Sequence, residues 1–110
     1  MGDWALSAMN LQPRQTDDSG VPLASLVGSL ENGTQLSPAQ LDKEGAVALS
    51  SLGFHIETPT NGRKFFDATT PANGRSLYQA QKMLGLVADS KLGPKTAAAL
   101  AWRLKDRWTA

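Results

Sequence analysis

The chain has 110 residues, a formal net charge of +1 and 41% hydrophobic residues, which fits one small globular domain with an appendage at most. The absence of cysteine excludes disulfides, cysteine-rich zinc sites and thiol catalysis, and a single histidine, His55, excludes multi-histidine metal sites within the chain. No apolar run approaches the roughly 20 residues that span a bilayer, and no signal peptide is visible at the N-terminus.

Residues 1–36 are predicted to form a leader segment that is irregular or partly helical. The run 12–20, QPRQTDDSG, is polar and rich in turn-forming residues, so it is a poor candidate for packed structure. Two short apolar patches, 4–9 and 21–30, flank this run, and each can form a turn or two of helix laid on the main domain. We therefore divide the chain into a leader, 1–36, and a helical domain, 37–110.

The first confident helix is expected to begin at Ser37 and Pro38. Serine is a good N-cap, and proline is tolerated at the first helical position because its missing N–H has no intrahelical partner there. An apolar stripe at helical spacing runs from Leu41 to Leu52. Gly53 is placed to end the helix in a left-handed conformation.

The connection from 55 to 75 is expected to be a long loop. The Asn-Gly pairs at 61–62 and 73–74 are strong turn dipeptides, and Phe65 and Phe66 are expected to anchor the loop to the core. A loop of this length in a compact domain is often functional, and a tolerated insertion is the equal alternative.

Two further amphipathic helices are predicted, over about 76–85 and 94–108. Leu77, Ala80 and Leu84 recur at helical spacing in the former. The latter keeps its apolar stripe over three turns. Three amphipathic helices with few strand signals predict an all-α fold, a small helical bundle.

The segment that joins these two helices carries a distinctive pattern. In order along the chain, its residues are Gln81, Gly85-Leu86, Asp89, Gly93-Pro94, Thr96 and Ala99-Leu100. This order and spacing resemble the peptidoglycan-binding domain family, which is found appended to phage and bacterial cell-wall hydrolases. The first helix, ending in Leu-Gly-Phe at 52–54, is similar to the family's first helix, so the resemblance covers about 37–104. It implies a small three-helix orthogonal bundle.

Most residues of this pattern have a structural interpretation. Asp89 can accept backbone N–H bonds in a tight turn, and Gly93 is expected to supply a conformation that a Cβ would resist. Pro94 begins the last helix, and Thr96 in its first turn can bond back toward exposed amides. Ser90 departs from the pattern, because the family usually has glycine there. The motif residues interpreted as mainly structural are Gln81, Gly85, Asp89, Gly93, Pro94 and Thr96.

The resemblance implies a non-catalytic module that binds peptidoglycan and targets or anchors a partner activity, with no cofactor. The partner can be a cell-wall hydrolase or a virion or secretion protein, and the expected location is the cell wall, the periplasm or a phage virion. The best candidates for contact with an anionic polymer of sugar and peptide combine charge, hydrogen-bond donors and a flat face for stacking on sugars. These candidate ligand-binding residues are Arg63, Lys64, Arg75 and Tyr78.

No catalytic or metal-binding residues are assigned. Glycan cleavage requires two carboxylates about 5–10 Å apart, and the candidates are Glu44, Glu57 and Asp67. The pair of His55 and Glu57 in the long loop is the combination of most interest, but a His-x-Glu in a loop is a weak signal for catalysis.

Two other classes of function remain open. One is a component of a virion or secretion apparatus that uses the fold for protein–protein docking. The other is a helix-turn-helix DNA reader, since the last helix carries Arg103, Lys105 and Arg107. Against DNA, the connection 86–93 is longer than the usual three or four residues, and these cations lie at the far end of the would-be recognition helix. We therefore expect no nucleic-acid partner.

Overall fold

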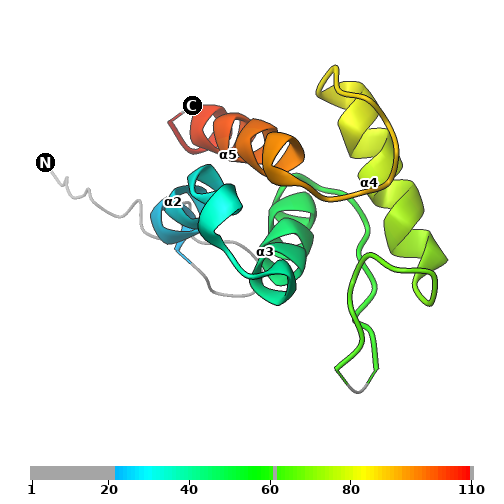
Figure 1. Cartoon of the computed structure of the whole chain (residues 1–110). Helices are drawn as coiled ribbons and strands as arrows, with labels where there is room; N and C mark the ends of the chain where they lie inside the picture. Colours follow the sequence, from blue (N-terminus) through cyan, green and yellow to red (C-terminus); the bar gives the residue numbers. More distant parts are fainter. Residues whose placement is uncertain (1–21, 61, 110) are drawn as a thin grey trace, which may run out of the picture.

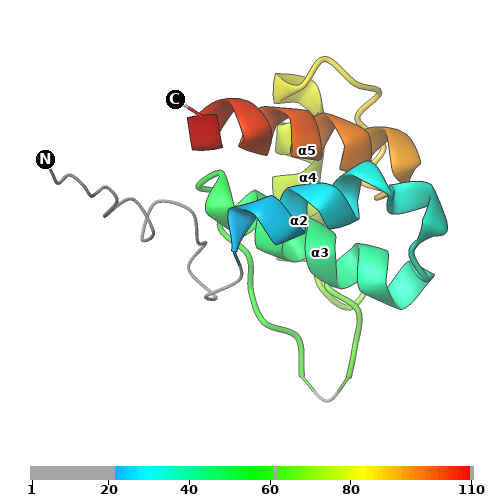
Figure 2. The ribbon, with the colours of Figure 1, turned by 90° about the vertical axis from the view of Figure 1, so that its left-hand side faces the viewer.

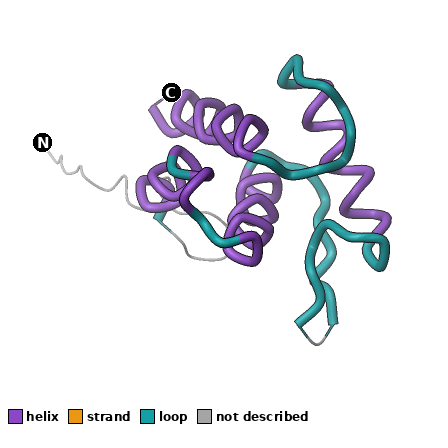
Figure 3. The backbone as a smooth tube through the Cα atoms, viewed as in Figure 1, coloured by secondary structure: helices purple, strands orange, loops and turns teal. Residues whose placement is uncertain are grey.

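The computed structural model describes residues 22–60 and 62–109, with the side chains of 107–109 left out of that description. Residues 1–21 of the expected leader and the side chain of Arg107 thus lie outside the described residues. Over the described ranges the fold is all-α, with no strand (Figures 1 and 3). The elements are α2 (Leu23–Glu31), the 3₁₀ turn η2 (Gly33–Gln35), α3 (Pro38–Ser51), α4 (Pro71–Met83) and α5 (Pro94–Thr109). The all-α prediction is confirmed, but the described residues form four helices where three were expected.

The additional helix, α2, belongs to the hydrophobic core. Leu23, Leu26, Val27 and Leu30 recur at helical spacing, and all four are buried. This face of α2 packs along α5 and also contacts α3 (Figure 2). The C-terminal part of the expected leader is therefore a helix that forms part of the core, and more than a turn laid on the surface.

Both ends of α3 follow the sequence signals. The Ser37 hydroxyl accepts a hydrogen bond from the backbone N–H of Gln40, and the Gln40 side chain accepts one from the N–H of Ser37, which makes a capping box. At the other end Gly53 has φ +97°, and the N–H of Phe54 donates to the carbonyl of Leu49. The predicted start and stop of this helix are confirmed.

The helix α4 begins at Pro71, earlier than the predicted start near residue 76. The pair Asn73-Gly74, interpreted as a turn, instead lies in its first turn. The Asn73 side chain is fully buried, accepts from the N–H of Glu57 and donates to the carbonyls of Glu57 and Phe65. These long-range bonds offset the weak helix propensity of asparagine and glycine. Arg75 consequently lies on a helix and not in the loop.

The connection between α3 and α4 projects from the helices as an extended loop pinned at its base (Figure 1). The Asp42 carboxylate accepts the N–H groups of Phe65 and Phe66 at 2.7 and 3.1 Å. The Phe66 side chain packs against the core, as predicted, and Phe65 is half-buried. The hydroxyl of Ser76 also donates to the carbonyl of His55. Both ends of the loop are therefore hydrogen-bonded to helices.

The last helix, α5, supplies the other wall of the core. Ala97, Leu100, Ala101 and Leu104 are fully buried and face α2 and α3. Within the described ranges, no helix is long and apolar enough to cross a membrane.

Because α2 shares this core, we expect Leu26→Ala to lower the free energy of unfolding by about 2–5 kcal/mol, the range for emptying a buried leucine site. Ser25→Ala, on the exposed side of the same helix, is the control and should change it by less than about 0.5 kcal/mol. Urea unfolding measures both. Equal, small effects of the two substitutions would show that α2 is dispensable to the core.

Candidate functional site

A single buried side chain, Gln81, organises the turn between α4 and α5. Its Oε1 accepts the backbone N–H groups of Asp89 and Ser90 at 3.2 and 2.9 Å. Its Nε2 lies 2.9 Å from the carbonyl oxygen of Lys91 and within 3.2 Å of Asp89 Oδ1 and Thr96 Oγ1. Since an amide carries two hydrogens, three acceptors share them. The network joins α4, the turn and the first turn of α5.

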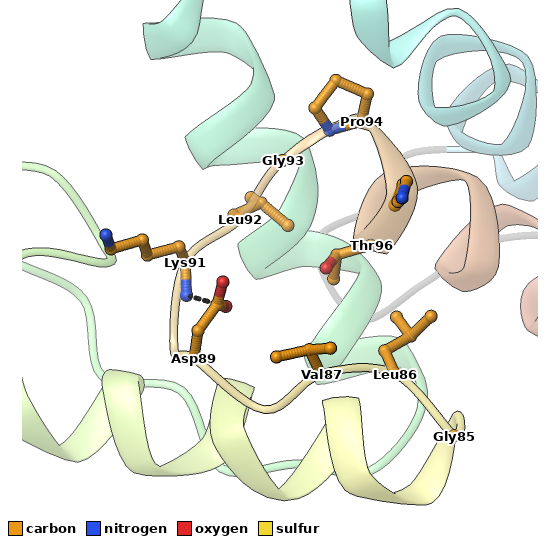
Figure 4. A pocket seen from close by; sticks show the side chains of 10 residues that line it. Gly85, Leu86, Val87, Asp89, Lys91, Leu92, Gly93, Pro94 and Thr96 are labelled. Atoms are coloured by element: carbon orange, nitrogen blue, oxygen red, sulfur yellow. Dashed lines mark hydrogen bonds between the residues drawn. The ribbon is translucent and has the colours of Figure 1, made fainter.

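Asp89 adds a second bond inside the same turn. Its carboxylate accepts the backbone N–H of Lys91 at 2.9 Å (Figure 4). This bond, together with the bond from Gln81, holds the pKa of Asp89 below its usual value, against a smaller opposing effect of desolvation. The predicted role of Asp89 as an acceptor of backbone N–H bonds is confirmed.

The residues of the turn that have a left-handed backbone conformation are not all those predicted from the sequence. Gly93 does not have a positive φ, and a Cβ built on it would meet no atom within 4 Å. The prediction that Gly93 supplies a conformation that a Cβ would resist is therefore wrong. The positive φ values belong to Gly85, at +75°, and Ser90, at +58°. Ser90 thus takes the conformation for which glycine is the usual residue, and its hydroxyl donates to the carbonyl of Gly74.

Arg75 and Tyr78 come together on the exposed face of α4. With Gln79 and Lys82 from the same helix and Ser90 from the turn, they surround an open pocket of about 590 Å³, which we call the α4 pocket. The Lys82 ammonium lies 5.6 Å from the centroid of the Tyr78 ring, within the range of a cation–π interaction. Two cations, a half-exposed phenol and an amide therefore converge at one opening.

The other two candidate ligand-binding residues lie elsewhere. Lys64 lines a separate pocket of about 360 Å³ together with Asp42 and Phe66. Arg63 is exposed in the projecting loop. Hydrogen bonds from Thr69, with the nearby charges of Arg63 and Lys64, lower the pKa of Asp67. The four predicted residues therefore do not form one site, and Arg75 and Tyr78 are the two that share a pocket.

A third pocket, of about 670 Å³, is lined by the α4–α5 turn and the start of α5, and we call it the turn pocket. Its wall is mainly apolar, from Leu86, Val87, Leu92 and Pro94, with Lys95 and the buried Thr96 beside them (Figure 4). The remaining lining residues are Gly85, Asp89, Lys91 and Gly93. All six motif residues thus belong either to this lining or to the Gln81 network.

Sequence reasoning missed Lys82 and Val87. Lys82 follows Tyr78 by four residues, the spacing that puts two side chains on one helix face, so periodicity could have found it. Val87 is 82% exposed, and nothing in the sequence separates it from the half-buried Leu86 beside it.

The carboxylates considered for catalysis lie on α3 and in the projecting loop. Glu57 Oε2 lies 3.7 Å from His55 Nε2, but both side chains are well exposed. Glu44 is on α3, and the Asp67 carboxylate accepts bonds from Thr69. Among the residues that the structure describes, no cluster of three or more histidine and acidic side chains could hold a metal ion.

Comparison with known proteins adds no assignment. No family model, no curated protein and no solved structure gives a significant match to the chain.

Because Gln81 satisfies several buried polar groups, Gln81→Leu should lower the free energy of unfolding by about 3 kcal/mol or more, at about 1–3 kcal/mol for each group left without a partner. Gln79→Leu, an exposed position on the same helix, is the matched control and should have little effect. Denaturant titration gives both values. A loss in Gln81→Leu no larger than in the control would contradict the role of the network.

The lowered pKa of Asp89 makes a prediction about pH. A carboxyl whose pKa is depressed by folding contributes stability above its unfolded pKa, here 3.8, and this contribution is lost as the pH falls through the folded pKa. Asp89→Asn should therefore be less stable than the parent at pH 7, and the difference should shrink below pH 3.8. Unfolding curves from pH 7 to pH 2.5 test this, and a difference independent of pH would contradict it.

Proposed function

We propose that this chain is a non-catalytic module that binds bacterial peptidoglycan and places a partner activity or assembly at the cell wall. In this proposal α3, α4 and α5 correspond to the three helices of a peptidoglycan-binding domain, and α2 is an added core helix. The support is that Gln81, Asp89 and Thr96, which carry the sequence resemblance, form one hydrogen-bonded network at the turn.

The observation that carries the proposal is the composition of the α4 pocket. A sugar polymer with carboxylate-bearing peptides needs donors for its hydroxyls, cations for its carboxylates and a flat apolar surface for its rings. Gln79 and Ser90 provide polar groups, Arg75 and Lys82 provide cations, and Tyr78 provides the ring. The backbone that carries these groups belongs to one helix and one hydrogen-bonded turn, so binding does not require the ordering of a loop.

Protein–protein docking is the second candidate, and one observation favours it. Trp102 on α5 is 73% exposed, and exposed tryptophan is enriched where proteins associate. DNA reading has less support. The α4–α5 connection occupies residues 84–93, and Lys105 Nζ lies 2.9 Å from the Glu31 carboxylate, which offsets part of the basic charge of α5.

Purified insoluble sacculi separate these classes. The protein is mixed with sacculi at low salt, the pellet is assayed, and a salt-titrated DNA gel shift is run beside it. Retention on sacculi without a DNA shift is the expected result. An absence of retention at low salt would overturn wall binding in favour of docking, and a shift of DNA alone would favour nucleic-acid binding.

Substitutions in the α4 pocket should weaken that retention. Tyr78→Ala and Arg75→Ala are each expected to reduce the affinity for sacculi about tenfold, as a loss of roughly 1.4 kcal/mol implies. Both side chains are exposed, so the fold should survive, which circular dichroism can verify. Trp102→Ala and Arg103→Ala remove an exposed aromatic and an exposed cation from α5 and are the matched controls. Equal losses in all four variants would place the binding surface elsewhere.

A further inference from the structure

The α4 pocket and the turn pocket are lined by neighbouring residues of one short segment, 89–91. Ser90 lines the α4 pocket, and its neighbours on both sides, Asp89 and Lys91, line the turn pocket. The Gln81 network fixes all three of these residues, because it bonds the N–H groups of Asp89 and Ser90 and the carbonyl of Lys91. The two pockets are therefore held in a fixed relation by the same few hydrogen bonds.

The two pockets differ in chemistry. The α4 pocket offers the phenol of Tyr78 with two cations and an amide, which suits a hydroxylated ring compound. The turn pocket offers the aliphatic side chains of Leu86 and Val87. It has no aromatic side chain among its lining residues, so it lacks a platform for stacking on a sugar.

The charged groups of the turn pocket favour an anion at its rim. Lys91 and Lys95 both line it, and neither has a carboxylate partner among the ion pairs of the described residues. Asp89 is the acidic lining residue, and its carboxylate is already engaged by the N–H of Lys91 and the Gln81 amide. In Figure 4 the Lys91 side chain extends away from Leu86 and Val87, whose side chains lie on the same side of the turn as Thr96. Lys95 is therefore the cation left to face this apolar wall, and a cation beside an apolar surface is complementary to a small apolar peptide that ends in a carboxylate.

We infer that the chain reads peptidoglycan in two parts, with the sugar in the α4 pocket and the attached short peptide in the turn pocket. This inference rests on the proposed function and adds to it the class of ligand for each of the two pockets. A polymer that carries both parts then binds more tightly than either part alone, because the second contact becomes intramolecular. Bare glycan strands and free stem peptides are thus the weaker ligands.

The test compares three probes: intact sacculi, glycan strands from which an amidase has removed the peptides, and a soluble synthetic stem peptide. Val87→Glu adds a negative charge at the lip of the turn pocket, and the position is 82% exposed, so folding should be unaffected. Ala98→Glu adds the same charge to an exposed position of α5 that does not line the turn pocket, and it is the matched control. Tyr78→Ala reports on the α4 pocket.

Val87→Glu should weaken binding to sacculi about fivefold or more and leave binding to bare glycan strands unchanged. Tyr78→Ala should weaken binding to both, and Ala98→Glu should weaken neither. The inference is overturned if Val87→Glu binds sacculi as the parent does, or if it loses sacculi and bare strands equally. If the unmodified protein binds neither sacculi nor bare strands, the proposed function itself is overturned. The two failures are therefore distinguishable.

Discussion

The Gln81 side-chain amide is the constraint on which the rest of this structure depends. A turn of ten residues between two helices leaves many backbone groups without partners, and such groups are costly to bury. Gln81 meets this demand from inside α4, with acceptors and donors that reach Asp89, Ser90 and Thr96. Glutamine is suited to the position because it both donates and accepts, whereas a carboxylate would only accept at neutral pH.

The turn also packs against α3. Leu92 follows the Gln81 network directly and lies so close to α3 that a Cβ on Gly45 would approach its Cδ2 to 2.2 Å. A glycine at that point lets the turn sit against α3, and α3 in turn holds the base of the projecting loop through Asp42. The hydrogen bonds of Gln81 thus fix the backbone of the turn, and the contact of Leu92 with Gly45 packs the turn against α3.

Local signals in the sequence predicted α3, the end of α4 and the start of α5, because caps, prolines and glycines act within a few residues. They did not predict the start of α4, since Asn73 is helical only through its bonds to Glu57 and Phe65, far away in the sequence. The full extent of α2 was missed although its leucines are helically spaced, because no side chain caps its start and the segment follows a polar run. The left-handed conformation was assigned to Gly93 by residue type, while the hydrogen bonds of the turn impose it on Ser90.

The candidate site shows the same division between local and long-range causes. Tyr78 was recognised by its chemistry, but its place beside Arg75 on one helix depends on α4 extending back to Pro71. Lys82 already lay within the predicted helix. Arg63 and Lys64 were selected for their charge and hydrogen-bond donors in a long loop, yet the length of that loop also brings Glu57 and Phe65 to the buried Asn73. The α4 pocket is accordingly lined by residues of α4 and of the turn, and by none of the projecting loop. Under the proposed function, binding at the α4 pocket requires no ordering of a loop, so this entropic cost does not reduce the binding free energy.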